Sequence, residues 1–108
     1  MATDLIAVYS TLPDRQTARA LAERLVAERL VACVNLFAIE SVYRWEGQIE
    51  RADEVALLMK THRSRYRQLE QALREGHPYD VPAIVAYDIA QALPAYGDWI
   101  AACVVRDA

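Results

Sequence analysis

The segment from residue 31 to residue 62 constrains the fold most, because it predicts an unusually long β-hairpin. Residues 31–45 are rich in β-branched and other apolar side chains, which is typical of a strand. Glu46 and Gly47 match a two-residue hairpin turn, in which glycine supplies the positive φ, and residues 48–61 indicate the returning strand. At about 3.3 Å per residue the first strand spans roughly 50 Å, whereas a compact domain of this size has a diameter of roughly 34 Å. We therefore expect the hairpin to project beyond its own domain.

The apolar side chains of this hairpin need a cover that the chain itself does not supply. Residues 31–39 and 55–59 are apolar on both faces, a pattern typical of strands buried on both sides. Tyr43 and Trp45 stand one strand period apart beside the turn, and each aromatic side chain buries about 150 to 250 Å² when it is covered. Because two strands alone in water are marginally stable, we expect the cover to come from another subunit. A kinked hairpin that folds back on its own helices is the alternative.

The order of the remaining segments predicts a ferredoxin-like arrangement, β-α-β-β-α-β, followed by a C-terminal helix. We expect one α+β domain that spans residues 1–108. Ser64 is expected to be the N-cap of the second helix and Gly76 its C′ residue. The expected elements are strands at residues 5–11, 31–45, 48–61 and 83–89, helices at residues 14–29 and between Ser64 and Gly76, and a C-terminal helix within residues 93–105.

Composition narrows the class of protein. The chain has 12 basic and 15 acidic residues and a formal charge of −3, which argues against a nucleic-acid partner. The N-terminus lacks a basic start and has only a short apolar run, so we expect neither a signal peptide nor a membrane span, and a cytoplasmic location. Cys33 and Cys103 are too few for a disulfide framework, and buried, reduced thiols are the ordinary interpretation.

Several stretches of the sequence together resemble the CutA divalent-cation tolerance family. They follow one another in the same order as in the family, and the resemblance spans nearly the whole chain. They are ACVN at residues 32–35, SVYRWEG at residues 41–47, the run from Glu54 to Thr61, HPYDVP at residues 77–82 and YGDWI at residues 96–100. The resemblance implies a very stable homotrimer of ferredoxin-like subunits, with sheets inward, helices outside and hairpins clasping neighbours. It implies tolerance of copper and other divalent metals, and an architecture similar to the trimeric PII signalling proteins, which bind small ligands between subunits.

Two positions depart from the family pattern. Ala38 and Ile39 stand where the family commonly has Pro-Gly, so a bulge in the hairpin at this point is open. Ala83 stands where an acidic residue often follows Val-Pro, which removes one metal ligand that the family often offers.

Cys33 and His77 are the candidate metal ligands. A thiolate is a soft ligand that suits Cu(I) or Zn, and the resemblance raises Cys33 above an ordinary core cysteine. If the turn sets an unbroken antiparallel register, Cys33 faces Lys60 across the hairpin. We expect no obligatory cofactor, and copper or another divalent metal as the ion that is bound.

A second set of candidates forms a ligand-binding cleft. Pro78 and Pro82 restrict the backbone of the loop that begins at His77, so the loop is expected to be stiff. Lys60 is the only lysine, and it would bind an anion or lower the pKa of a neighbouring thiol. The expected cleft residues are Lys60, Tyr79, Asp80 and Glu54.

The four aromatic residues Tyr43, Trp45, Tyr96 and Trp99 are expected at the trimer interface, where such side chains commonly act as anchors. No catalytic motif is present in the sequence, so we do not expect an enzyme. The favoured function is a cytoplasmic homotrimer for divalent metal tolerance with weak metal binding. The alternatives are a PII-like sensor of an anionic small molecule, bound between subunits, and a purely structural scaffold.

Overall fold

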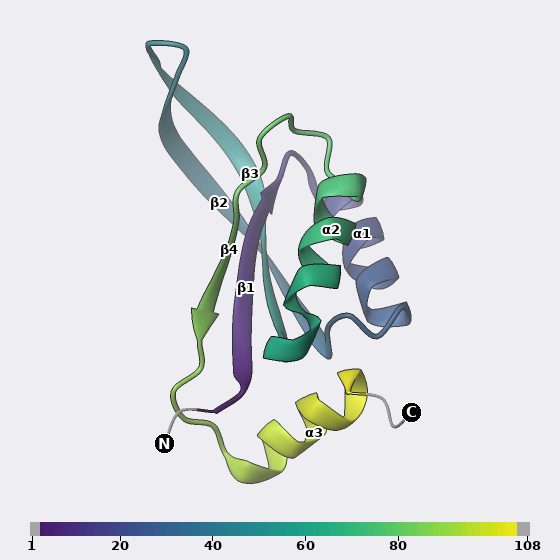
Figure 1. Cartoon of the computed structure of the whole chain (residues 1–108). Coiled ribbons are helices and arrows are strands. Elements are labelled where there is room, and N and C mark those ends of the chain that lie inside the picture. The colour runs from purple at the N-terminus through teal and green to yellow at the C-terminus, as the bar shows by residue number, and fades with distance from the viewer. Residues whose placement is uncertain (1–2, 106–108) are drawn as a thin grey trace.

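The computed structural model describes residues 3–105 and has the expected ferredoxin-like order (Figure 1). Its sheet has four strands in the order β2-β3-β1-β4, and all neighbouring strands are antiparallel. The C-terminal helix α3 lies across the lower end of the strands. The elements are β1 (Leu5–Leu12), α1 (Arg15–Ala27), β2 (Cys33–Trp45), β3 (Gln48–His62), a 3₁₀ turn (Arg63–Arg65), α2 (Tyr66–Gly76), β4 (Ile84–Asp88) and α3 (Pro94–Val104).

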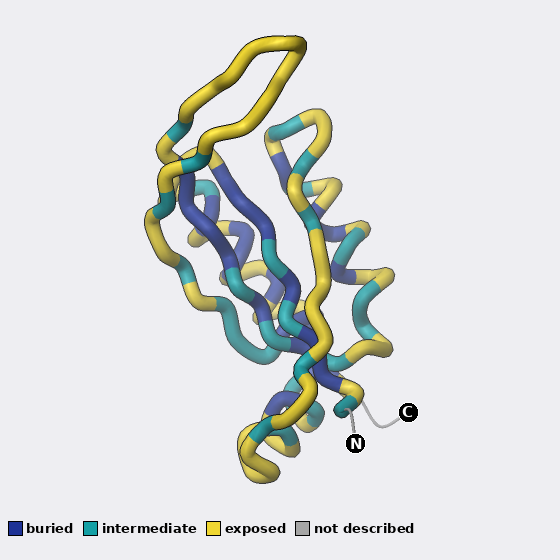
Figure 2. The backbone as a smooth tube through the Cα atoms, turned by 90° about the vertical axis from the view of Figure 1, so that its left-hand side faces the viewer, coloured by how far each residue is buried: buried dark blue, intermediate teal, exposed yellow. Residues whose placement is uncertain are grey.

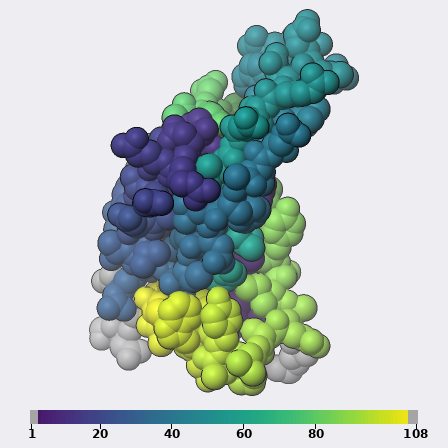
Figure 3. All heavy atoms as spheres, turned by 180° about the vertical axis from the view of Figure 1, so that it is seen from behind, coloured from purple at the N-terminus to yellow at the C-terminus, as the bar shows by residue number. Residues whose placement is uncertain are grey.

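The long hairpin is confirmed, and its register is unbroken. Every residue of β2 pairs with one of β3, from Cys33 with Lys60 to Trp45 with Gln48, so the predicted pairing of Cys33 is confirmed. Ala38 pairs with Val55 in this ladder, which answers the question of a bulge: there is none. The molecule measures 46 × 27 × 21 Å, and the hairpin stands clear of the rest (Figure 3).

The turn of the hairpin has the backbone that the sequence predicts. Glu46 has a φ of 48° and Gly47 a φ of 80°, so both central residues are left-handed. Two such residues define the type I′ turn, whose twist matches that of the flanking strands. This match explains why the long ladder continues to its last pair.

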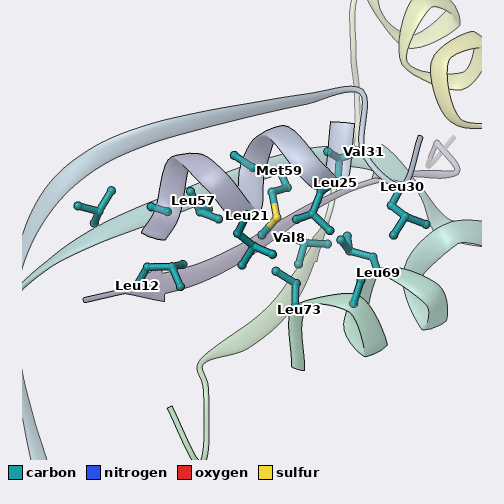
Figure 4. Packing of buried hydrophobic residues seen from close by; sticks show 14 of the residues in the cluster. Val8, Leu12, Leu21, Leu25, Leu30, Val31, Leu57, Met59, Leu69 and Leu73 are labelled. Carbon is teal, nitrogen blue, oxygen red and sulfur yellow. The ribbon is translucent and has the colours of Figure 1, made fainter. Parts of the chain in front are cut away.

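The core lies between one face of the sheet and the helices α1 and α2 (Figure 4). Alternate residues of each strand point toward the helices, because successive side chains in a strand face opposite sides. Both helices contribute leucines at helical spacing. The central side chains of this core, all at most 5% exposed, are Val8, Leu12, Leu21, Leu25, Leu57, Met59, Leu69 and Leu73.

The opposite face of the sheet, here called the open face, has no helical layer over most of its area. The central strands β1 and β3 are the most buried in Figure 2, and the outer strands are more exposed. Phe37 is 42% exposed and Tyr87 58% exposed on this face. Helix α3 covers only the lower end, where Ile100 and Val104 are fully buried and Gly97 approaches Leu5.

Two predictions about the second helix are wrong. Ser64 is not its N-cap: it lies inside the 3₁₀ turn, and His62 accepts the Ser64 N–H through Nδ1 at 3.1 Å. Gly76 is not the C′ residue but the last residue of α2, with His77 after it. This glycine lies close to α1: a Cβ at this position would lie 2.9 Å from Leu21 Cδ1, so a larger residue would require the Leu21 side chain to shift.

Candidate functional site

A groove lies on the open face, between the projecting hairpin and the loop that follows α2. Its volume is about 480 Å³, which is within the usual range for small-molecule sites. The walls come from β1, β2, β3 and the loop that follows α2. Its main lining residues are Tyr9, Tyr43, Trp45, Glu54, Tyr79 and Asp80.

Glu54 and Tyr79 form the polar centre of this groove. Glu54 is 9% exposed, and its Oε2 accepts a hydrogen bond of 2.7 Å from the Tyr79 hydroxyl. Burial raises the pKa of the Tyr79 phenol far above its ordinary value, and the negative charge of Glu54 adds to the shift. Tyr79 therefore keeps its proton, and its hydroxyl donates to Glu54.

His77 holds the loop in place. The residue is 9% exposed. Its Nε2 donates to the Thr11 carbonyl at 2.7 Å, and its Nδ1 accepts the Tyr79 N–H at 3.1 Å. A carbonyl only accepts and an N–H only donates, so these two partners require the neutral imidazole with its proton on Nε2. Burial lowers the pKa of His77, against the opposing effects of the Thr11 carbonyl and Glu54. Both ring nitrogens are therefore engaged in positioning Tyr79.

The lowered pKa of His77 predicts a pH-dependent stability. Above its ordinary pKa of about 6.5 the imidazole is neutral in both the folded and the unfolded chain. As the pH falls below that value the unfolded chain binds the proton first, so the free energy of unfolding decreases until the folded pKa is passed. We expect the urea midpoint to fall between about pH 7.5 and pH 5. His77→Gln should lose most of this dependence.

The matched control for this measurement is His62→Gln, at the only other histidine of the chain. That variant should retain the dependence, because His77 is unchanged. Equal slopes of urea midpoint against pH for the parent and His77→Gln would contradict the assignment.

Cys33 lies in a different cluster, at the lower end of the open face. Its thiol is 3.9 Å from Asn35 Oδ1, and the same oxygen accepts a hydrogen bond from Lys60 Nζ. The Tyr96 hydroxyl comes next to the thiol from α3, and its pKa is raised, first by burial and then by Cys33. This thiol cluster thus combines a partly exposed sulfur, an ammonium group and a phenol.

The structure separates residues that the sequence put into single sites. Cys33 pairs with Lys60 of β3, and Lys60 pairs in turn with Ala7 of β1. His77 instead binds the carbonyl of Thr11, which lies about 13 Å from Ala7 along β1. Lys60 is likewise six residues from Glu54 on β3, about 20 Å along the strand. Within residues 3–105 no group of three or more His, Cys, Asp or Glu side chains is placed to hold a metal ion. One subunit therefore offers neither a complete metal site nor a lysine inside the groove.

The predicted interface aromatics form two pairs at opposite ends of the molecule. Tyr43 and Trp45 are 45% and 47% exposed on the hairpin. Tyr96 and Trp99 stack on α3 with ring centroids 5.7 Å apart, and both remain partly exposed.

Sequence reasoning did not single out Tyr9, Phe37 and Asn35 as site residues. Strand alternation places all three on the same face of the sheet as Cys33. Alternation reveals such a shared face across strands only when the register between the strands is known.

Comparison with known proteins gives one consistent result. The model of the CutA1 divalent ion tolerance protein family matches residues 6–103. The divalent-cation tolerance protein CutA of Thermococcus kodakarensis is 39% identical over 98 residues, which are 91% of this chain and 94% of that protein. The CutA1 crystal structure from Oryza sativa superposes with a TM-score of 0.93 at 34% identity and covers 98% of both chains. The structure of the periplasmic divalent cation tolerance protein CutA from Archaeoglobus fulgidus gives a TM-score of 0.91 at 36% identity, over 93% of this chain and 98% of that one.

The four-stranded antiparallel sheet and its helices define a ferredoxin-like subunit with an overhanging hairpin, and the solved CutA structures from Oryza sativa and Archaeoglobus fulgidus share its fold. The chain belongs to the CutA1 divalent ion tolerance family.

The names of the relatives point to more than one cellular compartment. One structure is described as periplasmic, and a relative from Arabidopsis thaliana, 40% identical over 88% of this chain and 53% of its own length, is named chloroplastic. Among the described residues no helix is long and apolar enough to cross a membrane.

Proposed function

We propose that this chain forms a homotrimer that serves in the tolerance of divalent metal ions, by binding rather than by catalysis. The observation that carries the proposal is the match to the CutA1 family over residues 6–103. We also propose a cytoplasmic location, since Cys33 and Cys103 are both free thiols, as expected of a protein from a reducing compartment.

The open face supports assembly. Phe37 on one edge strand and Val85 and Tyr87 on the other are between 42% and 58% exposed on it, and exposed apolar side chains that gather on one face mark interaction sites. The strands β2 and β4 form the two edges of the sheet, and an edge strand offers its backbone groups to another chain. A second and third copy would cover this face and support the projecting hairpin.

Copper is the first metal to test, and Cys33 is its proposed ligand. Its sulfur is partly exposed in the thiol cluster, and a thiolate prefers the soft ion Cu(I). The ammonium of Lys60 lies beside it, which opposes a doubly charged ion more than a singly charged one. Because one thiolate does not complete a coordination sphere, the remaining donors must come from neighbouring copies or from solution, and binding is expected to be weak. His77 would have to give up a hydrogen bond before it could join them.

Titration with Cu(I) under anaerobic conditions tests this ligand. Cys33→Ser should weaken binding by about tenfold or more, because a hydroxyl is a poor ligand for a soft ion. Cys103→Ser is the matched control, since Cys103 is also a partly exposed free thiol but lies on α3. Unchanged stoichiometry and affinity in Cys33→Ser would remove Cys33 from the proposal.

The second candidate function, a sensor of an anionic small molecule bound by Lys60, Tyr79 and Asp80, requires a neighbouring subunit. Lys60 stands in the thiol cluster, and the groove of the same subunit is lined by the carboxylates of Glu54 and Asp80. An anion would therefore bind only where a lysine from another copy reaches the groove.

A further inference from the structure

The open face carries two charged side chains that have no opposite charge beside them in the subunit. Glu54 is 9% exposed, and its hydrogen-bond partner is the neutral hydroxyl of Tyr79. Lys60 lies on the same face of β3, and its Nζ donates to the neutral amide oxygen of Asn35. Within residues 3–105 neither Glu54 nor Lys60 takes part in an ion pair. The two charges are about 20 Å apart along the strand, so they do not compensate each other inside one subunit.

Assembly through the open face makes both charges unfavourable unless they meet. This step rests on the homotrimer proposed above, in which neighbouring copies cover the face and exclude water from it. A buried charge without a counterion is strongly destabilising, whereas a buried pair with good geometry recovers much of the lost hydration. The interface therefore either leaves Glu54 and Lys60 both unpaired or brings them together from different copies.

Strand alternation leaves one candidate for the cation. Among the positions of β1–β4 that share the open face, Lys60 is the only lysine or arginine. The hairpin arginines Arg44 and Arg51 point to the opposite face, because they lie an odd number of positions from the open-face residues Trp45 and Glu54. The strands of a covered open face can thus offer Glu54 one cation, Lys60 of another copy.

The groove around Glu54 suits a lysine side chain. Its walls include the rings of Tyr9, Tyr43, Trp45 and Tyr79, and none of its lining residues is lysine or arginine. The methylenes of a lysine pack on apolar surface while its ammonium group reaches a polar one, and the faces of aromatic rings attract the ammonium. The groove therefore combines a carboxylate for the charge with rings for the stem.

We propose that Lys60 of one copy enters the groove of the next copy and pairs with its Glu54. The two residues belong to different parts of the open face, so the contact between two copies is head-to-tail. A head-to-tail contact forms a closed ring when the rotation between copies closes. In the trimer each copy gives Glu54 to one neighbour and Lys60 to the other, and the charge of each groove is compensated only by assembly.

Charge reversal with rescue tests the pair, and light scattering at micromolar concentration measures the mass. Glu54→Lys and Lys60→Glu each place like charges at every contact, and each should lower the mass from three times 12.2 kDa, or 36.6 kDa, to 12.2 kDa. The double variant Glu54→Lys/Lys60→Glu restores opposite charges and should return the mass to that of the trimer. Asp53→Lys is the matched control, since it makes a similar charge reversal one residue away on the opposite face of β3. That variant should keep the parent mass.

A cross-link keeps the proposal testable if the charge-reversal variants fail to fold. In a Cys33→Ser/Cys103→Ser background, which removes both native thiols, Glu54→Cys/Lys60→Cys should be joined by a short bismaleimide into a covalent trimer. Two thiols about 20 Å apart in one subunit are beyond the reach of this reagent, so the product on a denaturing gel reports contact between copies. Asp53→Cys/Lys60→Cys in the same background should remain at the mass of one subunit.

The outcomes separate the pair from the trimer itself. A parent mass of 12.2 kDa would contradict the trimer and the pair together. A trimeric parent whose single reversals keep its mass, whose double variant is not rescued, or whose double-cysteine variant gives no covalent trimer would overturn the pair alone. Rescue of Glu54→Lys by Arg44→Glu or Arg51→Glu, and not by Lys60→Glu, would also overturn it, because the cation would then come from the other face of the hairpin.

Discussion

Replacement of Phe37 by glutamate is expected to convert the protein from a particle of three times 12.2 kDa, or 36.6 kDa, into a subunit of 12.2 kDa. Phe37 lies on the open face in the edge strand β2 and pairs with Ala56 of β3, which pairs in turn with Thr11 of β1. In a homotrimer that buries this face, the substitution introduces three carboxylates at once. An unpaired charge that is forced into an interface costs several kcal/mol. Light scattering at micromolar concentration measures the change in mass.

The matched control is Val26→Glu. Val26 is 43% exposed and Phe37 is 42% exposed, but Val26 lies on α1, on the helical side of the sheet. This variant gains the same charge at a similarly exposed apolar position and should keep the mass of 36.6 kDa that we expect for the parent. A parent mass of 12.2 kDa would contradict the trimer itself, whereas a Phe37→Glu mass equal to the parent's would contradict the role of the open face.

Truncation of Leu57 to alanine should produce the largest loss of stability within the subunit. Leu57 is fully buried between the sheet and the helices (Figure 4). Removal of a fully buried leucine leaves a cavity, and the free energy of unfolding should fall by about 3 kcal/mol, within a range of about 2 to 5. Urea unfolding followed by circular dichroism measures this change, at one fixed protein concentration because assembly adds to the apparent stability.

Leu93→Ala is the control with the same change of side chain. Leu93 is 72% exposed, so its truncation should change the free energy of unfolding of the subunit by less than about 0.5 kcal/mol. A loss for Leu57→Ala that is no larger than this would show that the two helices do not depend on the β3 side chains for their packing.

The hairpin shows how much of the fold follows from local sequence. Glu46 and Gly47 adopt the left-handed turn that their sequence indicates, and a two-residue turn leaves one possible register. The pairing of Cys33 with Lys60 was therefore predictable from the turn for an unbroken ladder, and the structure shows that the ladder has no bulge. The element order was predictable for the same reason, since strand alternation, helical spacing and turn residues act over a few neighbouring residues.

The second helix shows where local reasoning failed. Ser64 is a good N-cap residue in isolation, but the ring of His62 caps the preceding turn instead. Gly76 matches a C′ residue in isolation, yet it is the last residue of α2 and packs next to Leu21 of α1. For Ser64 the competing contact comes from a residue only two positions away, whereas for Gly76 the neighbour lies on a different helix.

By itself the sequence determined the ferredoxin-like order, the long hairpin with its two-residue turn, and the apolar character of a sheet face that the chain does not cover; the structure decided that the hairpin has no bulge. Only the tertiary structure decided which polar groups meet: Tyr79 binds Glu54, His77 binds the carbonyl of Thr11, and Lys60 is far from both. The physical reason is the separation in sequence over which each interaction acts. Turn geometry and side-chain alternation are fixed by adjacent residues, whereas Thr11 and His77 are 66 positions apart and come together only when strand and loop are placed by the common core.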